Sequence, residues 1–349
     1  MKTMVLTGIR RMEPAEAPEP EIEQAGDVLL NVERVGICGS DVHYYATGRI
    51  GSMVVAYPFR VGHEFSATVA RTGAAVTRVK PGDRVAIDPA VSCGRCDQCA
   101  AGRRHTCRHL RFLGCPGQLE GCLAERIVMP EECCYPIGPH TGLDQAALSE
   151  PLSIGVYAAR LAGPLAGARV GILGSGPIGL SVLVAARAVG AGPIYATDKI
   201  PARLEAARTA GAGWTGNPDR EDVVAEIARR EPLLLDAVFE CCGEQEALDQ
   251  AVELLKPGGQ LLLVGIPSAE RVSFVIDRMR RKEIRVQNVR RQNECTQPAL
   301  DMIDAEQVNV DFMATHHFPF AETPEAFALV EEYRDGVVKA IVRIGTENA

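Results

Sequence analysis

Four cysteines in the first third of the chain have a spacing that suits a metal ion. They are Cys93, Cys96, Cys99 and Cys107. Two-residue gaps let neighbouring thiolates converge on one tetrahedral ion, and four sulfurs fill its coordination sphere. A filled sphere leaves no position for a substrate, so the spacing predicts a structural zinc. The alternatives are four free thiols or an iron–sulfur cluster, which the long fourth gap and the lack of a following proline disfavour.

A second group of residues has the side-chain types of a metal site, although its members are farther apart in sequence. Cys38 stands within Gly36–His43, and His63 and Glu64 follow one another. Zinc prefers thiolate and imidazole ligands, and an incomplete protein shell leaves room for water or an alcohol. Each of these residues also suits an ordinary buried position. The residues by themselves therefore leave a catalytic metal and a purely structural role equally open.

A glycine-rich turn, Gly-Ser-Gly-Pro-Ile-Gly, follows an apolar segment and precedes an expected helix. In a dinucleotide-binding turn the first glycine makes the tight bend, the second lets the backbone approach a pyrophosphate, and the third lets helix and strand pack closely. The N–H groups and positive dipole at the start of the helix hold the phosphates. The residues of this expected cofactor turn are Gly174, Gly176, Pro177, Ile178 and Gly179.

Asp198 ends the next expected strand, about twenty residues past the last glycine. An acid at this position accepts hydrogen bonds from the adenosine ribose and repels a 2′-phosphate, so it favours NAD over NADP. Lys199 and Arg203 are expected beside the same part of the cofactor. Their positive charges would partly offset the repulsion.

The elements that must position these residues are of two kinds. The first 150 residues contain short β-branched segments such as Val28–Val32, broken by turns such as Lys80–Asp83. From about Leu152, apolar runs alternate with alanine-rich helical stretches, which is the βαβ pattern of a parallel sheet. The sequence predicts strands at 169–173, 193–197, 233–240, 260–265 and 284–289, and helices at 180–189, 201–210 and 245–255. The C-terminal residues lose this pattern and are expected to return to the first part.

Length and composition indicate a globular chain of about two domains. The 349 residues are 46% hydrophobic and 23% charged, with a net charge of −8. This acidic balance argues against nucleic acid or an anionic membrane as the main partner, despite the arginines around Cys107. No apolar stretch has the length of a membrane span, and the N-terminus lacks the pattern of a signal peptide. We expect a cytoplasmic protein whose twelve cysteines serve metals or remain free thiols.

Taken together, the motifs resemble the zinc-dependent medium-chain alcohol dehydrogenases. Gly62–Glu64, the four-cysteine loop, Ser149–Pro151 and the glycine-rich turn occur in the order of that family. The segments Gly36–Tyr45, Thr47–Gly51 and Thr315–Pro319 are most similar to its sorbitol (polyol) dehydrogenase branch. The resemblance covers nearly the whole chain.

The resemblance implies an α/β fold in which a GroES-like, mostly β catalytic domain carries an inserted Rossmann-type domain with a doubly wound parallel sheet. The expected boundaries are 1–152 for the first catalytic segment, 153–290 for the NAD-binding domain and 291–349 for the return segment. The family also implies a homo-oligomer, either a dimer or a tetramer.

The same resemblance implies the residues of the active site. One catalytic and one structural zinc are expected per chain, and the implied ligands of the catalytic zinc, besides water, are Cys38, His63, Glu64 and Glu150. Glu150 would bind the metal directly or through the water. Ser40 and His43 resemble the family's proton relay, and Tyr44, Glu150 and Arg290 its substrate contacts. The implied NAD contacts, besides the glycine-rich turn, are Asp198, Arg203, Val264, Gly265, Ile266, Asn288, Val289 and Arg290.

The resemblance implies the reversible oxidation of a secondary hydroxyl of a polyol, such as sorbitol or xylitol, to a ketose, with zinc and NAD. Arg291 departs from the branch, where a sorbitol enzyme typically has an aromatic residue. Its positive charge would suit a substrate with an acid or phosphate group, although a solvated or cofactor-facing arginine explains it as well. The alternatives are L-threonine 3-dehydrogenase and a sugar-alcohol-phosphate dehydrogenase. A non-catalytic relative that binds zinc and nucleotide is disfavoured, because no fold requires the ligand and relay residues together.

Overall fold

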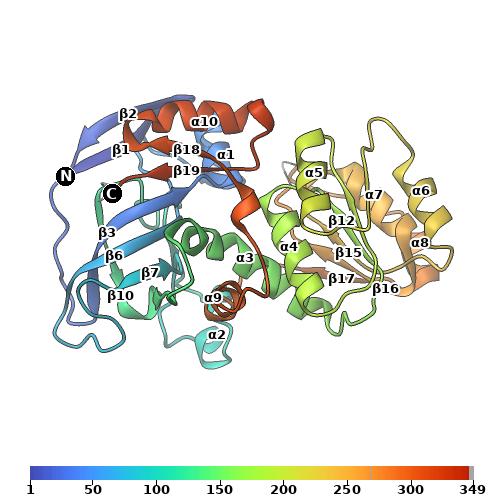
Figure 1. Cartoon of the computed structure of the whole chain (residues 1–349), viewed down its shortest axis with the longest axis horizontal. Coiled ribbons are helices and arrows are strands. Elements are labelled where there is room, and N and C mark those ends of the chain that lie inside the picture. Colours follow the sequence, from blue (N-terminus) through green and yellow to red (C-terminus); the bar gives the residue numbers. More distant parts are fainter. Residues whose placement is uncertain (268, 346–349) are drawn as a thin grey trace. The chain divides into compact units, whose positions relative to one another are not determined.

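The computed structural model describes residues 1–267 and 269–345, which form two compact units (Figure 1). The first unit comprises Met1–Glu150, Leu300–Ala305 and the residues from Ala314 onwards. The second comprises Pro151–Ala299 and Glu306–Met313. The expected domain boundaries stay predictions. In the structure the first unit ends its first segment at Glu150, and residues 291 to 299 group with the second unit.

A seven-stranded sheet forms the centre of the first unit. Its strand order is β11–β7–β6–β3–β19–β18, and β10 also pairs with β3. The strands are β3 (Asp27–Gly36), β6 (Glu64–Thr72), β7 (Arg84–Ile87), β10 (Arg126–Pro130), β11 (Cys134–Pro136), β18 (Ala314–Pro319) and β19 (Lys339–Arg343). Pairing of β19 with β3 is antiparallel and brings the last described strand beside the N-terminal part of the chain.

Smaller elements surround this sheet. They are β1 (Lys2–Gly8), β2 (Arg11–Glu16), α1 (Gly39–Thr47), β4 (Arg49–Ile50), β5 (Met53–Val54), β8 (Ala90–Val91), α2 (Asp97–Ala100), β9 (Arg111–Phe112), α10 (Thr323–Glu331) and four short 3₁₀ turns. The helices α3 (Leu143–Ala162) and α9 (Thr296–Asp304) each contribute residues to both units, and a further 3₁₀ turn, Asp311–Met313, belongs to the second. Figure 1 shows α10 lying along β18 and β19. Buried residues such as Leu30, Phe65, Val85 and Phe327 belong to one continuous core. This core holds the segments that carry the candidate metal ligands.

The second unit contains a six-stranded parallel sheet with the order β14–β13–β12–β15–β16–β17. Its strands are β12 (Val170–Leu173), β13 (Ile194–Thr197), β14 (Trp214–Gly216), β15 (Leu235–Glu240), β16 (Leu255–Leu263) and β17 (Arg285–Asn288). Its helices are α4 (Pro177–Ala188), α5 (Pro201–Thr209), α6 (Val223–Arg230), α7 (Gln245–Leu254) and α8 (Ile276–Lys282). Figure 1 shows α4 and α5 on one face of the sheet and α7 and α8 on the other. In such a doubly wound sheet the order reverses between β12 and β15, and ligands bind beyond the carboxyl ends of the strands there.

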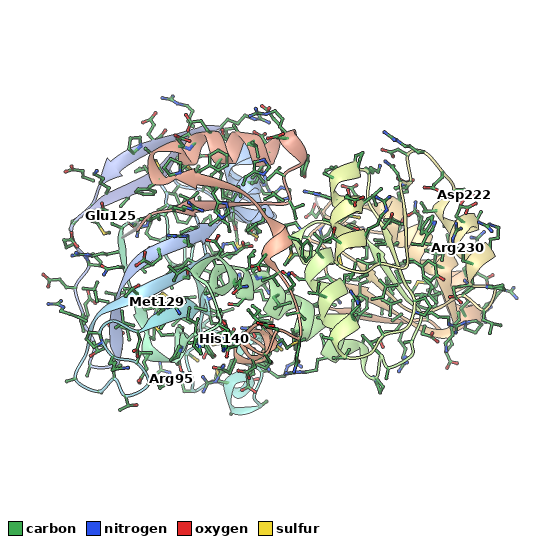
Figure 2. All side chains as sticks on the ribbon, in the orientation of Figure 1. Arg95, Glu125, Met129, His140, Asp222 and Arg230 are labelled. Carbon is green, nitrogen blue, oxygen red and sulfur yellow. The ribbon has the colours of Figure 1, made fainter. Side chains whose placement is uncertain are left out.

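Local sequence explains most of these elements. Strands β12 and β13 are buried at every position, as parallel strands covered on both faces must be. Asp222 and Arg230 lie at opposite ends of α6 (Figure 2), and the Asp222 carboxylate caps the helix by accepting the Ala225 N–H at 3.0 Å. The turn expected at 256–259 is instead part of β16. The pairing there jumps from Leu255 to Gln260, so the extra residues bulge out of the strand.

Within the described residues, no helix combines the length and the apolar character needed to cross a bilayer.

We expect Asp236→Asn to destabilise the second unit at neutral pH but not in acid. Arg169 hydrogen-bonds the Asp236 carboxylate at 2.9 and 3.1 Å and, helped by Lys256 at 2.6 Å, holds the pKa of Asp236 well below its usual value. A depressed pKa gives stability that is present above the unfolded value of about 4 and is lost as the pH falls further. Urea unfolding should show a loss of about 1–2 kcal/mol at pH 7. A difference between wild type and variant that persists unchanged at pH 2 would contradict this account.

Candidate zinc and cofactor sites

Three side chains of the first unit form a compact group of metal-ligand type. Ligand atoms of Cys38, His63 and Glu64 all lie within 4.8 Å of one another. Cys38 is the N-cap residue of α1, and His63 directly precedes Glu64 at the start of β6. His63 and Glu64 are buried, whereas Cys38 is half-buried. One thiolate, one imidazole and one carboxylate fit a tetrahedral zinc whose fourth position stays open for water or substrate.

A buried aspartate that sequence reasoning missed orients His63. Asp41 Oδ1 lies 3.3 Å from His63 Nδ1 and accepts the Gly62 N–H at 3.1 Å, while Oδ2 accepts the Cys38 N–H at 3.3 Å. A carboxylate at Nδ1 leaves Nε2 to face a metal. Burial works against a charged imidazole, but Asp41 and Cys38 outweigh it and raise the pKa of His63 well above its usual value. Metal binding would displace that proton.

Lys339 is a second residue of the site that sequence reasoning missed. Its Nζ lies 2.8 and 2.6 Å from the two carboxylate oxygens of Glu64 and donates to the Ile37 carbonyl at 3.0 Å. Both partners of this ion pair are buried, at 2% exposure for Lys339 and 1% for Glu64. Gly36 leaves the space that Glu64 needs, since a Cβ there would come within 2.5 Å of Oε2. The sequence signal was one lysine directly before the apolar residues 340–342.

Glu150 lies near the three-residue group but outside it. It belongs to α3 and is 6% exposed. Burial raises the pKa of Glu150 to about 7, with His63 opposing this rise and Glu64 adding to it. The set of ligand atoms within 4.8 Å does not include Glu150. Its binding to zinc, direct or through water, stays a prediction.

Helix α1 carries the residues predicted for proton transfer and substrate binding. Ser40 Oγ donates to Cys38 Sγ at 3.3 Å, which places the hydroxyl beside a metal ligand. His43 lies on the exposed side of the same helix. Tyr44 is buried, with its OH 3.7 Å from Cys115 Sγ and 3.9 Å from Met53 Sδ. The relay and the substrate contact stay predictions.

The four-cysteine loop gathers its thiols as the spacing predicted. Ligand atoms of all four lie within 4.8 Å of one another. Backbone N–H groups, first that of Cys99, lower the pKa of Cys96 to about 6, which favours the thiolate that zinc binds. Arg95, labelled in Figure 2, is exposed in this loop. Arg108 pairs with Asp97 through contacts of 2.5 and 2.9 Å, so this arginine is already neutralised within the loop.

The glycine-rich turn has the geometry of a phosphate-binding turn. Gly174 follows β12 with φ of +94°, and a Cβ there would meet Cys242 at 2.9 Å. Gly176 caps α4, and Pro177 is its first residue. A Cβ on Gly179 would lie 1.9 Å from the Gly174 carbonyl oxygen, so only glycine lets the helix approach the turn this closely. The free N–H groups at the start of α4 remain available to an anion.

Asp198 lies at the carboxyl end of β13, beside this turn. Its two oxygens accept the N–H groups of Ser175 and Ile200, both at 2.8 Å, and Arg203 Nη1 lies 4.0 Å away. Lys199 is exposed and contacts Asp219 at 3.1 Å and Glu246 at 3.6 Å. Two acids thus already balance the lysine charge that would attract a 2′-phosphate.

The other predicted cofactor residues lie at the same edge of the sheet. Ile178 is in the first turn of α4, Val264–Ile266 follow β16, and Asn288 ends β17. Val289 donates to the Leu263 carbonyl at 2.9 Å, and Arg290 and Arg291 come next in the chain. These positions are at the carboxyl ends of the strands, where a doubly wound sheet binds its ligand.

Comparisons with known proteins show the family to which the chain is similar. The family model described as "Alcohol dehydrogenase GroES-like domain" matches residues 24–139, and "Zinc-binding dehydrogenase" matches residues 177–305. Sorbitol dehydrogenase of Bacillus subtilis (strain 168) is 34% identical over 343 residues, which cover 98% of this chain and 97% of that protein. D-xylulose reductase A of Aspergillus niger is 34% identical over 340 residues, which cover 96% and 94%.

A solved structure has the same fold over nearly the whole chain. A protein of Sinorhizobium meliloti 1021, solved with NADP bound, matches with a TM-score of 0.90 at 31% identity, over 98% of this chain and 99% of that one. The similarity therefore extends over both units.

Proposed function

Because the chain belongs to the zinc-containing medium-chain alcohol dehydrogenase superfamily, we propose that it catalyses the reversible, NAD-dependent oxidation of a secondary hydroxyl of a polyol to a ketose. The observation that carries this proposal is the group of Cys38, His63 and Glu64, whose three ligands would leave a zinc position open to substrate. The polyol-dehydrogenase relatives favour a polyol as the substrate.

The bound cofactors would supply the chemistry that side chains lack: zinc polarises the hydroxyl and lowers its pKa, and NAD accepts the hydride. The chain's own residues position and deprotonate the substrate. Asp41 keeps His63 in the tautomer that can bind the metal. Ser40, beside Cys38, would accept the hydroxyl proton while giving up its own, and the exposed His43 would release a proton to solvent.

An absorbance assay of NAD reduction against a substrate panel tests the proposal. The panel contains sorbitol, xylitol, galactitol, ribitol, 2,3-butanediol, L-threonine and a sugar-alcohol phosphate, each with and without a chelator. Chelator-sensitive turnover of a polyol is the expected result. Turnover of L-threonine alone, or of the sugar-alcohol phosphate alone, would contradict the proposal that the substrate is a polyol. Arg291 would then be the first residue to substitute. No turnover by protein with zinc and NADH bound would favour a non-catalytic relative.

We further expect Asp198→Asn to relax the preference for NAD. Asparagine can still accept the Ser175 N–H that Asp198 accepts at 2.8 Å, although it cannot accept the Ile200 N–H as well, and it removes the charge that repels a 2′-phosphate. The ratio of kcat/KM for NAD to that for NADP should fall about tenfold, which corresponds to roughly 1.4 kcal/mol. Asp222→Asn, which removes an acid from the cap of α6, is the control and should leave the ratio unchanged. An unchanged ratio in both variants would refute the role of Asp198.

The expected homo-oligomer is also part of the proposal, and light scattering of the purified chain would measure its size.

A further inference from the structure

A buried glutamate, Glu240, lies at the carboxyl end of β15, next to the position where the strand order reverses. It is 2% exposed. One carboxylate oxygen, Oε1, accepts the Cys242 N–H at 2.7 Å and the Gly243 N–H at 2.5 Å. A buried carboxylate is costly unless hydrogen bonds compensate it, so these contacts fix the backbone of residues 241–243.

The loop after the neighbouring strand β16 packs against the same carboxylate. The Glu240 carbonyl accepts the N–H groups of Val264 and Gly265 at 2.8 and 2.9 Å. A Cβ on Gly265 would lie 2.8 Å from Glu240 Oε2 and 2.4 Å from the Gly243 nitrogen. A Cβ on Gly243, whose φ is +76°, would lie 2.4 Å from the Ile266 carbonyl oxygen. The loops after β15 and β16 can therefore pack this closely around Glu240 only because glycine occupies positions 243 and 265.

The third loop is the glycine-rich turn after β12. The Cys241 N–H donates to the Leu173 carbonyl at 2.8 Å, directly before Gly174. A Cβ on Gly174 would meet the Cys242 nitrogen at 3.0 Å. The loop held by Glu240 thus forms one wall of the turn that is expected to bind the pyrophosphate.

We infer that Glu240 is a positioning residue for the nicotinamide cofactor. Its carboxylate holds the loop after β15, and the loops after β12 and β16 pack against that loop in the arrangement that binds NAD. The role was not apparent from the sequence, where Glu240 ends an apolar strand and resembles an ordinary strand terminus. The inference rests on the proposed function, since it requires that these loops bind the cofactor.

Titration of NADH by its fluorescence, on zinc-loaded protein, tests the inference through binding rather than activity. Glu240→Ala leaves two backbone N–H groups without their acceptor and should weaken NADH binding about tenfold, or roughly 1.4 kcal/mol. Glu240→Gln keeps a carbonyl oxygen in the place of Oε1 and should restore affinity to within about threefold of wild type. If Glu240→Ala does not fold, Glu240→Asp keeps the charge but withdraws the carboxylate by one methylene, and it should weaken binding as well.

Asp236→Asn is the matched control, because Asp236 lies near the amino end of the same strand and binds Arg169 instead of a loop. It should lower the thermal midpoint without changing NADH affinity. In steady-state assays Glu240→Ala should raise KM for NAD while KM for the alcohol at saturating NAD stays near wild type. Wild-type affinity in Glu240→Ala, or equal weakening in Asp236→Asn, would overturn the inference. Failure of the wild-type chain to bind NADH or NADPH would instead overturn the proposed cofactor.

Discussion

Cys38→Ala should lose one of two bound zinc ions and nearly all activity while the fold stays intact. Cys38 offers the only thiolate of the three-residue group, and a metal that polarises the hydroxyl supplies several kcal/mol of the rate enhancement. We therefore expect kcat to fall on the order of 10³-fold or more. Metal analysis, circular dichroism and the NAD reduction assay on the same sample measure the three quantities together.

Cys96→Ser is the reciprocal control, because Cys96 belongs to the four-cysteine loop. It should also lose one zinc, but the loss should lower the thermal midpoint and leave more activity than Cys38→Ala. A structural ion contributes to folding free energy, whereas a catalytic ion contributes to the reaction. Full turnover by Cys38→Ala protein that lacks one zinc would refute the assignment of the catalytic site.

Most strands and three helices of the second unit could be predicted from the sequence, whereas β14, α6 and α8 were not predicted. Its strands are apolar on both faces, as in β12 and β13, and Pro177 and Pro201 mark helix starts that depend only on local chain geometry. The cofactor-binding role of the glycine-rich turn and of Asp198 was predicted from their positions directly after those strands. Local pattern was sufficient for these elements because a strand buried on both faces and a helix start depend on nearby residues, although β12 also pairs with β15, which is distant in the chain.

In the first unit, local sequence pattern was not sufficient to predict the residues of the candidate zinc site. Cys38, His63 and Glu64 were predicted as ligands only through the family resemblance, since their spacing alone left the question open. Lys339 could not be predicted, because the pairing of β19 with β3 brings it to Glu64 from the far end of the chain. Asp41 lies inside a recognised motif, but its role depends on how α1 sits against the start of β6. Each missed residue contacts the side chain of a predicted metal ligand: Asp41 contacts His63, and Lys339 contacts Glu64. These contacts form only when the chain folds.

Lys339→Met should destabilise the zinc-free protein strongly. The variant leaves the Glu64 carboxylate, 1% exposed, without the ammonium that contacts both of its oxygens. Removing one partner of a buried ion pair costs about 3–5 kcal/mol, because the remaining charge stays desolvated. Urea unfolding in the presence of a chelator measures this loss without a contribution from bound metal.

Two further variants distinguish the effect of an unpaired buried charge on stability from the effect of losing any lysine. The double variant Lys339→Met/Glu64→Gln removes both charges and should recover most of the stability. Lys256→Met removes a lysine that pairs with Asp236 at a more exposed position. It should lower the free energy of unfolding by at most about 1 kcal/mol. Equal losses in the two single lysine variants, or no recovery in the double variant, would contradict the buried-pair account.

Zinc should then reverse part of the Lys339→Met defect. In the wild type the Lys339 ammonium and a metal ion compete for the same carboxylate, so removing the lysine leaves Glu64 to be neutralised by the metal alone. We expect tighter zinc binding at this site and a larger stabilisation by zinc in the variant than in the wild type. Chelator competition and unfolding with and without zinc measure both. Equal zinc affinity in the two proteins would mean that Glu64 does not bind the metal, whereas tighter binding would identify Glu64 as a ligand that Lys339 restrains.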